Sequence, residues 1–173
     1  MAAYRSLLRA RSLTARLPGA PGFTLIELVI TVAIIAVLAT VVLPVNELVV
    51  QRSKEQDLRR ALRDMREAID AYKQASDEGR VKKSIGDSGY PKKLELLVEG
   101  VDDEKSPKKD KIYFLRRIPR DPFNTDPNMP AVATWGKRSY QSPPDDPKDG
   151  DDVFDVFSLA QGNGINGRPY KEW

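Results

Sequence analysis

The chain of 173 residues contains no cysteine and no histidine. Without histidine it cannot use a Ser-His-Asp or Cys-His catalytic group, and it cannot form a histidine-ligated metal site. Without cysteine it has no disulfide framework, no iron–sulfur cluster and no redox-active dithiol. An oxidising compartment remains open to it, but disulfide bonds would not stabilise the fold there.

Acidic residues are absent from the first 22 positions, which carry the excess positive charge of the chain. The whole sequence has 28 Lys+Arg against 25 Asp+Glu. Removing residues 1–22 takes away four arginines and leaves 24 basic against 25 acidic residues. The near-neutral remainder offers no obvious basic face of the kind that binds DNA or RNA, so we expect no nucleic-acid partner. The four arginines are Arg5, Arg9, Arg11 and Arg16.

One long apolar run follows this basic segment. Of the 19 positions from Leu25 to Leu43, 16 are apolar, and no Lys or Arg occurs between Arg16 and Arg52. About 20 apolar residues suffice for a helix to cross a bilayer, so residues 23–43 are predicted to span a membrane. A buried helix of a soluble protein and a cleaved secretory signal are the alternatives, but the run is long for either and leads directly into Pro44. The preceding arginines predict a cytoplasmic N-terminus and place the following 130 residues across the membrane.

Glu27 interrupts the start of the apolar run. A carboxylate inside a bilayer costs roughly 2–3 kcal/mol or more and usually serves a function. Alternatively, Glu27 reaches the lipid headgroups, where the N-terminus of a helix would favour its negative charge. The position of this residue in the sequence leaves both interpretations open.

The string Gly22-Phe23-Thr24-Leu25-Ile26-Glu27 resembles the signature of type IV prepilins. The resemblance implies that a prepilin peptidase removes residues 1–22 as a leader by cleaving between Gly22 and Phe23, and then N-methylates Phe23. Gly22 has no side chain, so an extended backbone can enter a protease cleft there. The resemblance also implies that the apolar helix is retained. Glu27 then serves subunit assembly by pairing with the Phe23 amine of a neighbouring copy, since pairing lowers the cost of burying both charges.

Residues 44–78 continue the helix with an amphipathic pattern. Apolar residues recur at spacings of three and four from Leu58 to Tyr72. Opposite charges four apart are expected to pair on the exposed side, namely Glu55 with Arg59, Arg60 with Asp64, and Arg63 with Glu67. We predict one helix from about Thr24 to about Ala75. Pro44 lies inside it and predicts a kink, either as a fixed bend or as a segment that stretches during assembly.

Residues 79–173 are predicted to form a small α+β head. Ten of the 13 prolines lie in residues 80–173, which excludes a long helix. Residues 81–88 and 101–111 are predicted to be loops, and one short helical turn is expected over residues 94–98. Residues 137–142 and 153–159 are the expected strands of a small antiparallel sheet packed on the amphipathic half of the helix. The predicted fold is therefore a long N-terminal helix, half membrane-spanning and half amphipathic, with a pilin-like head.

A second resemblance covers the head. The segments Ile118–Phe123, Trp135-Gly136 and Asp155–Leu159, followed by a Gly- and Asn-rich loop, look like the G-type major pseudopilins of type II secretion systems. That family commonly binds calcium in the last loop, but residues 160–167 of this chain contain no carboxylate. Asn163 and Asn166 are the remaining candidate ligands, and turn formation is the favoured interpretation of both. The acidic segment 143–152 is predicted to be a solvated loop. A calcium-binding loop is the alternative, because clustered carboxylates suit a hard cation, but their spacing matches no recognisable ligand pattern.

These resemblances imply a structural subunit with no enzymatic activity. Copies would polymerise into a helical pseudopilus that drives protein export, with minor pseudopilins and an inner-membrane assembly platform as further partners. The head would lie in the periplasm of a bacterium, on a single-pass inner-membrane anchor. A subunit of an extracellular type IV pilus is the alternative. A membrane-anchored enzyme using a carboxylate pair such as Asp121 and Asp155 is a third hypothesis, but the loop-rich head leaves little room for a cleft.

Overall fold

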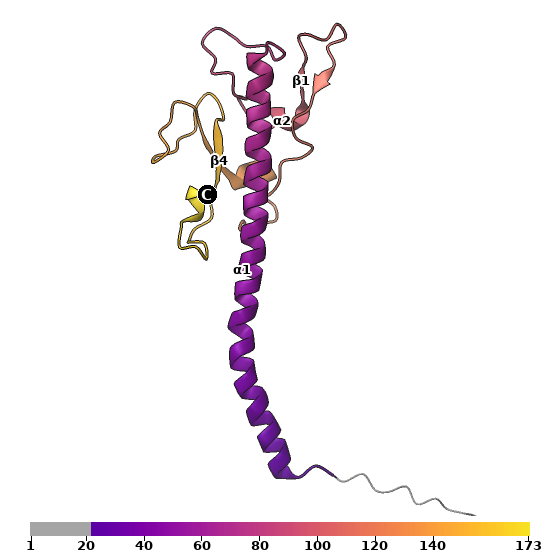
Figure 1. Ribbon diagram of the computed structural model, residues 1–173, viewed down its shortest axis with the longest axis vertical. Coiled ribbons are helices and arrows are strands. Elements are labelled where there is room, and N and C mark those ends of the chain that lie inside the picture. The colour runs from indigo at the N-terminus through magenta and orange to yellow at the C-terminus, as the bar shows by residue number, and fades with distance from the viewer. Residues whose placement is uncertain (1–21) are drawn as a thin grey trace, which may run out of the picture. The chain divides into compact units, whose positions relative to one another are not determined.

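The computed structural model describes residues 22–173, apart from the side chains of residues 41–46. The predicted long helix is present as α1 (Leu25–Asp77), and each of its ends lies within two residues of the predicted end. The head follows as α2 (Leu96–Glu99), β1 (Val101–Asp102), β2 (Lys111–Ile112), β3 (Trp135–Arg138) and β4 (Asp155–Ser158), with short 3₁₀ turns η1 (Ala131–Thr134) and η2 (Tyr170–Glu172) (Figure 1). The predicted α+β fold with a long N-terminal helix is confirmed. Apart from Gly22, the predicted leader lies outside the described residues.

The chain divides into two compact units, which meet between Leu43 and Pro44. In the first unit, Phe23 and the apolar side chains of α1 from residue 25 to residue 40 are exposed. Among the residues with described side chains, no helix combines the length and apolarity needed to cross a bilayer. The helix predicted to cross the membrane includes residues 41–43, whose side chains lie outside the described part. The backbone of α1 continues through Pro44, and the kink predicted there remains a prediction.

The core of the second unit forms on one stripe of α1. Leu58, Met65 and Ile69 are fully buried, and they pack with residues of the head. Trp135, Val153 and Val156 complete this core, so the predicted packing of the sheet region on the apolar stripe is confirmed. Within this unit, β4 lies on one side of α1 while α2 and β1 lie on the other (Figure 1). The helix is therefore the central element around which the head folds.

The head contains two two-stranded antiparallel sheets rather than one. In the larger sheet, β3 and β4 pair from Trp135 opposite Ser158 to Arg138 opposite Asp155. The strand predicted at residues 137–142 instead spans residues 135–138. It starts two residues earlier, where the Trp135 ring is buried and its indole N–H donates to the carbonyl of Pro119 at 2.8 Å, and residues 139–142 are not part of it. The smaller sheet pairs β1 with β2, so the segment predicted to be a loop over residues 101–111 is closed by strand pairing at both ends.

Candidate functional site

The predicted cleavage position lies just before the start of α1. Gly22 and Phe23 precede the helix, and the Phe23 residue is 89 % exposed. A side chain added at Gly22 would meet no other atom of the described chain within 4 Å. Within the described residues, nothing therefore obstructs the scissile bond proposed between these two residues, as a protease substrate requires.

Thr24 and Glu27 form a capping box at the N-terminus of α1. The backbone N–H and the hydroxyl of Thr24 both donate to Oε2 of Glu27 at 2.8 Å, and the backbone N–H of Glu27 lies 3.3 Å from the Thr24 hydroxyl oxygen. A Ser or Thr followed three residues later by Glu satisfies backbone donors that a helix end otherwise leaves unpaired. The Thr-x-x-Glu spacing is visible in the sequence and is the signature of this cap.

The capping box gives Glu27 a role inside its own subunit. Its carboxylate is exposed and is held by Thr24, the residue that follows Phe23, and cleavage would create the new amine on Phe23. The same group can therefore order the first helical turn and present a negative charge to a neighbouring copy. Any test of the pairing hypothesis must separate these two roles.

A second cluster of polar contacts holds the C-terminal segment against α1. Glu55 is only 4 % exposed, and its Oε1 accepts the backbone N–H of Ile165 at 2.8 Å and the Tyr170 hydroxyl at 3.2 Å. The Gln51 amide donates both to Glu55, at 3.2 Å, and to the Tyr170 oxygen, at 3.0 Å. Burial raises the pKa of the Tyr170 hydroxyl, so it stays a protonated donor at neutral pH. We call Gln51, Glu55, Ile165 and Tyr170 the Glu55 cluster.

Glu55 was predicted to lie on the exposed side of the helix, and this prediction is wrong. Its expected ion pair with Arg59 is present at 3.7 Å, but the Glu55 side chain is buried because the C-terminal segment folds back over it. Arg60 forms an ion pair with Asp57, at 3.5 Å, rather than the predicted one with Asp64. The face of α1 that was predicted to be solvated is thus partly an internal contact surface.

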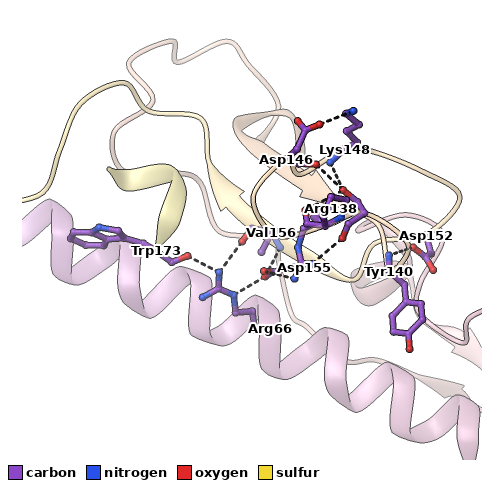
Figure 2. A network of polar contacts seen from close by, with 11 residues as sticks. Arg66, Arg138, Tyr140, Asp146, Lys148, Asp152, Asp155, Val156 and Trp173 are labelled. Carbon is purple, nitrogen blue, oxygen red and sulfur yellow. Dashed lines mark hydrogen bonds and ion pairs between the residues drawn. The ribbon is translucent and has the colours of Figure 1, made fainter. Parts of the chain in front are cut away.

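Arg66 makes a further connection between α1 and the head (Figure 2). Its guanidinium donates to the Asp155 carboxylate at 2.8 Å, to the Val156 carbonyl at 3.2 Å and to the backbone oxygen of Trp173 at 2.7 Å. Arg138 reaches the other oxygen of Asp155 from β3, at 3.4 Å. One arginine therefore joins the helix, β4 and the C-terminal segment through hydrogen bonds to three residues.

The last loop does not offer a donor set that fits calcium. It contains no carboxylate, and the amide oxygen of Asn166 already accepts the backbone N–H of Arg168 at 3.1 Å. Asn163 forms an isolated bridge with Pro169. The nearest acid with a described contact to this loop is Glu55, whose Oε1 already accepts three hydrogen bonds. Within the described residues, no group of three or more Asp or Glu side chains is placed to hold a metal ion.

Asp121 and Asp155 occupy separate structural sites. Asp121 is 2 % exposed, accepts the Ser158 hydroxyl and receives the backbone N–H of Phe123 at 2.8 Å. Asp155 and Ser158 are three residues apart on β4 and so lie on opposite faces of the sheet. The two carboxylates therefore do not face one another as a catalytic pair would, and each already has protein partners.

If the Glu55 cluster rather than calcium holds the last loop, chelation should leave stability unchanged. We expect the melting temperature of the detergent-solubilised chain to stay the same after excess EDTA, measured by circular dichroism. A bound ion at a hundredfold excess over its dissociation constant would contribute about 2.7 kcal/mol. A fall of many degrees on chelation would show that the chain holds a cation.

Replacing Glu55 by alanine should destabilise the head. The change removes the acceptor of the partly buried Ile165 N–H and of the buried Tyr170 hydroxyl, and leaving a buried donor unpaired costs roughly 1–3 kcal/mol. We expect a melting temperature several degrees lower in the same assay and faster trypsin cleavage at Arg168. Glu67→Ala, an exposed acid on the same helix, is the matched control and should behave as the unmodified chain. Equal stability of the two variants would contradict the role given to Glu55.

Comparison with known proteins gives one match to the start of the chain and one that covers most of its length. Residues 20–43 match the family described as the prokaryotic N-terminal methylation motif. The chain is also 27 % identical, over 157 residues, to the type II secretion system core protein G of Dickeya chrysanthemi. That similarity covers 84 % of this chain and 94 % of the relative. No solved structure matches the chain significantly.

Proposed function

We propose that this prepilin-like chain is a structural subunit of a type II secretion pseudopilus, of the same kind as core protein G. A prepilin peptidase removes residues 1–22 and methylates the amine of Phe23. The mature subunit then polymerises through its apolar helix into a filament whose growth drives protein export. The chain acts as a structural element and catalyses no reaction.

The observation that carries this proposal is the combination found at the start of α1. A methylation motif, an exposed Gly22–Phe23 bond, a capped helix start and exposed apolar side chains follow each other within residues 20–43. An exposed apolar surface of this length needs a partner, either lipid or protein. In a subunit that first lies in a membrane and is then packed into a filament, the apolar side chains contact lipid first and other subunits afterwards.

The motif and the similarity support a membrane-anchored subunit. We place the N-terminus in the cytoplasm, because the four leader arginines lie on that side of the apolar run, and the head in the periplasm. Further copies of the chain, the peptidase, minor pseudopilins and an inner-membrane assembly platform are the partners this role requires. The similarity to a secretion-system protein over most of the chain favours this assignment over a subunit of an extracellular pilus.

Assembly can be tested in cells that produce the chain together with its peptidase and assembly machinery. Brief amine crosslinking followed by an immunoblot should give a ladder of multimers, and electron microscopy should show short filaments labelled by antibodies against the head. Cells without the peptidase provide the control and should give only the monomeric precursor. A monomer in both strains would contradict the proposal.

A further inference from the structure

Charge is strongly segregated on the head although the mature chain is nearly neutral. The loop 143–152 carries five aspartates against one lysine. Its base is closed by a hydrogen bond from the Ser139 N–H to the Lys148 carbonyl, at 3.0 Å. A second hydrogen bond, from the Tyr140 N–H to Asp152 at 2.9 Å, is drawn in Figure 2. Asp145 and Asp151 are exposed. We call residues 143–152 the acidic loop.

A basic groove lies elsewhere on the head, between α1 and the segment that follows β2. Four arginines and two aspartates line it, together with apolar residues. Its rim is firmly held, because Phe114 and Leu115 both donate to the Leu97 carbonyl and Arg120 donates to the carbonyls of Asp126 and Met129. Arg116 and Arg117 are exposed on this rim. The charged residues of the groove are Asp57, Arg60, Asp64, Arg116, Arg117 and Arg120.

The acidic loop and the basic groove belong to opposite flanks of the head. Asp64 lines the groove, whereas Arg66, two residues on, binds β4. Residues two apart on an α-helix point about 160° away from each other, so these contacts lie on nearly opposite sides of α1. Figure 1 shows the same division, with β4 and the loop before it on one side and α2 on the other. The acidic loop of one copy therefore cannot reach the basic groove of the same copy.

We propose that the acidic loop of one copy docks on the basic groove of the next copy in the filament. This inference rests on the proposed function, since it assumes that copies assemble. Two different, complementary surfaces give a head-to-tail contact, and such contacts build open helical polymers. Complementary charge also sets the register and excludes like-charged approaches. The contact uses surfaces separate from the apolar helix and would position the heads relative to one another.

Disulfide trapping tests the contact in the assembled full-length chain. The chain has no cysteine, so a cysteine pair reports only on the positions chosen. Co-expression of Asp145→Cys and Arg117→Cys chains should give a disulfide-linked dimer, because the two residues would lie within bonding reach. Asp145→Cys with Lys108→Cys, on the hairpin between β1 and β2, is the matched control and should give none. No dimer above this control would overturn the proposal.

Charge reversal provides a second, independent measurement. We expect Arg116→Glu with Arg117→Glu to reduce the yield of antibody-labelled filaments seen by electron microscopy about tenfold, and Asp145→Lys with Asp151→Lys in the same chain to restore most of that yield. The matched change Lys105→Glu with Lys108→Glu should leave the yield unchanged. If the unmodified chain forms filaments but reversal at Arg116 and Arg117 has no effect, this contact is wrong and the proposed function stands. If the unmodified chain forms none, both fail.

Discussion

Replacing Gly22 by leucine should stop maturation and leave only the longer precursor on an immunoblot. Cleavage needs the backbone at the scissile bond to lie extended in the peptidase, and a branched side chain at that residue would obstruct it. The part of the chain that the structure describes has room for the change, because a side chain at Gly22 meets no described atom within 4 Å. The expected loss of processing is therefore an effect on the peptidase and not on folding.

Two comparisons make this result specific. Gly22→Ala adds only one methyl group and should be processed more than Gly22→Leu. The head of the unprocessed leucine variant should show the trypsin resistance of the unmodified chain, since the Glu55 cluster and the Arg66 contacts remain intact. Normal maturation of Gly22→Leu would contradict the assignment of the cleavage site.

Glu27→Ala should be inserted and cleaved but should assemble poorly. The variant helix is more apolar, so its retention in the membrane should if anything improve. In the filament the amine of a neighbouring Phe23 would lose its partner, and an unpaired buried charge costs about 3–5 kcal/mol. We expect crosslinked multimers to fall by more than about a hundredfold in equilibrium terms. Multimer yields equal to those of the unmodified chain would refute pairing, even with the family assignment standing.

The capping box supplies the variants that separate pairing from helix capping. Glu27→Gln can keep the contacts with Thr24, because glutamine also completes a capping box, but it cannot neutralise an amine. Thr24→Val keeps the carboxylate and loses the cap, which costs about 1 kcal/mol. Pairing predicts that Glu27→Gln fails like Glu27→Ala while Thr24→Val still assembles. If capping alone mattered, Glu27→Gln would assemble and Thr24→Val would not.

Local sequence patterns predicted the parts of the fold that depend on periodicity. The apolar stripe and its spacing located α1, and alternation located β4. The start of β3 was missed because burial of Trp135 is decided by a distant carbonyl, that of Pro119. The pairing of β1 with β2 was missed because each strand has only two residues, too few to show alternation.

The burial of Glu55 could have been predicted from the sequence, but this residue was interpreted as a surface charge. Gln51 and Glu55 continue the spacing of Leu58, Leu62 and Met65, so they belong to the buried stripe. A carboxylate on such a stripe needs donors, and those come from the last loop, more than 100 residues away in the chain. A helical pattern can indicate that a polar residue is buried, but only the folded head shows what satisfies it.

The intact mass of the chain isolated from membranes tests the central claim most directly. The account predicts a single species that lacks residues 1–22 and carries one additional methyl group on Phe23. Tandem mass spectrometry would place that methyl group on the terminal amine. A species that retains the leader in cells with an active prepilin peptidase would contradict the account, since the chain would then be an ordinary membrane-anchored protein.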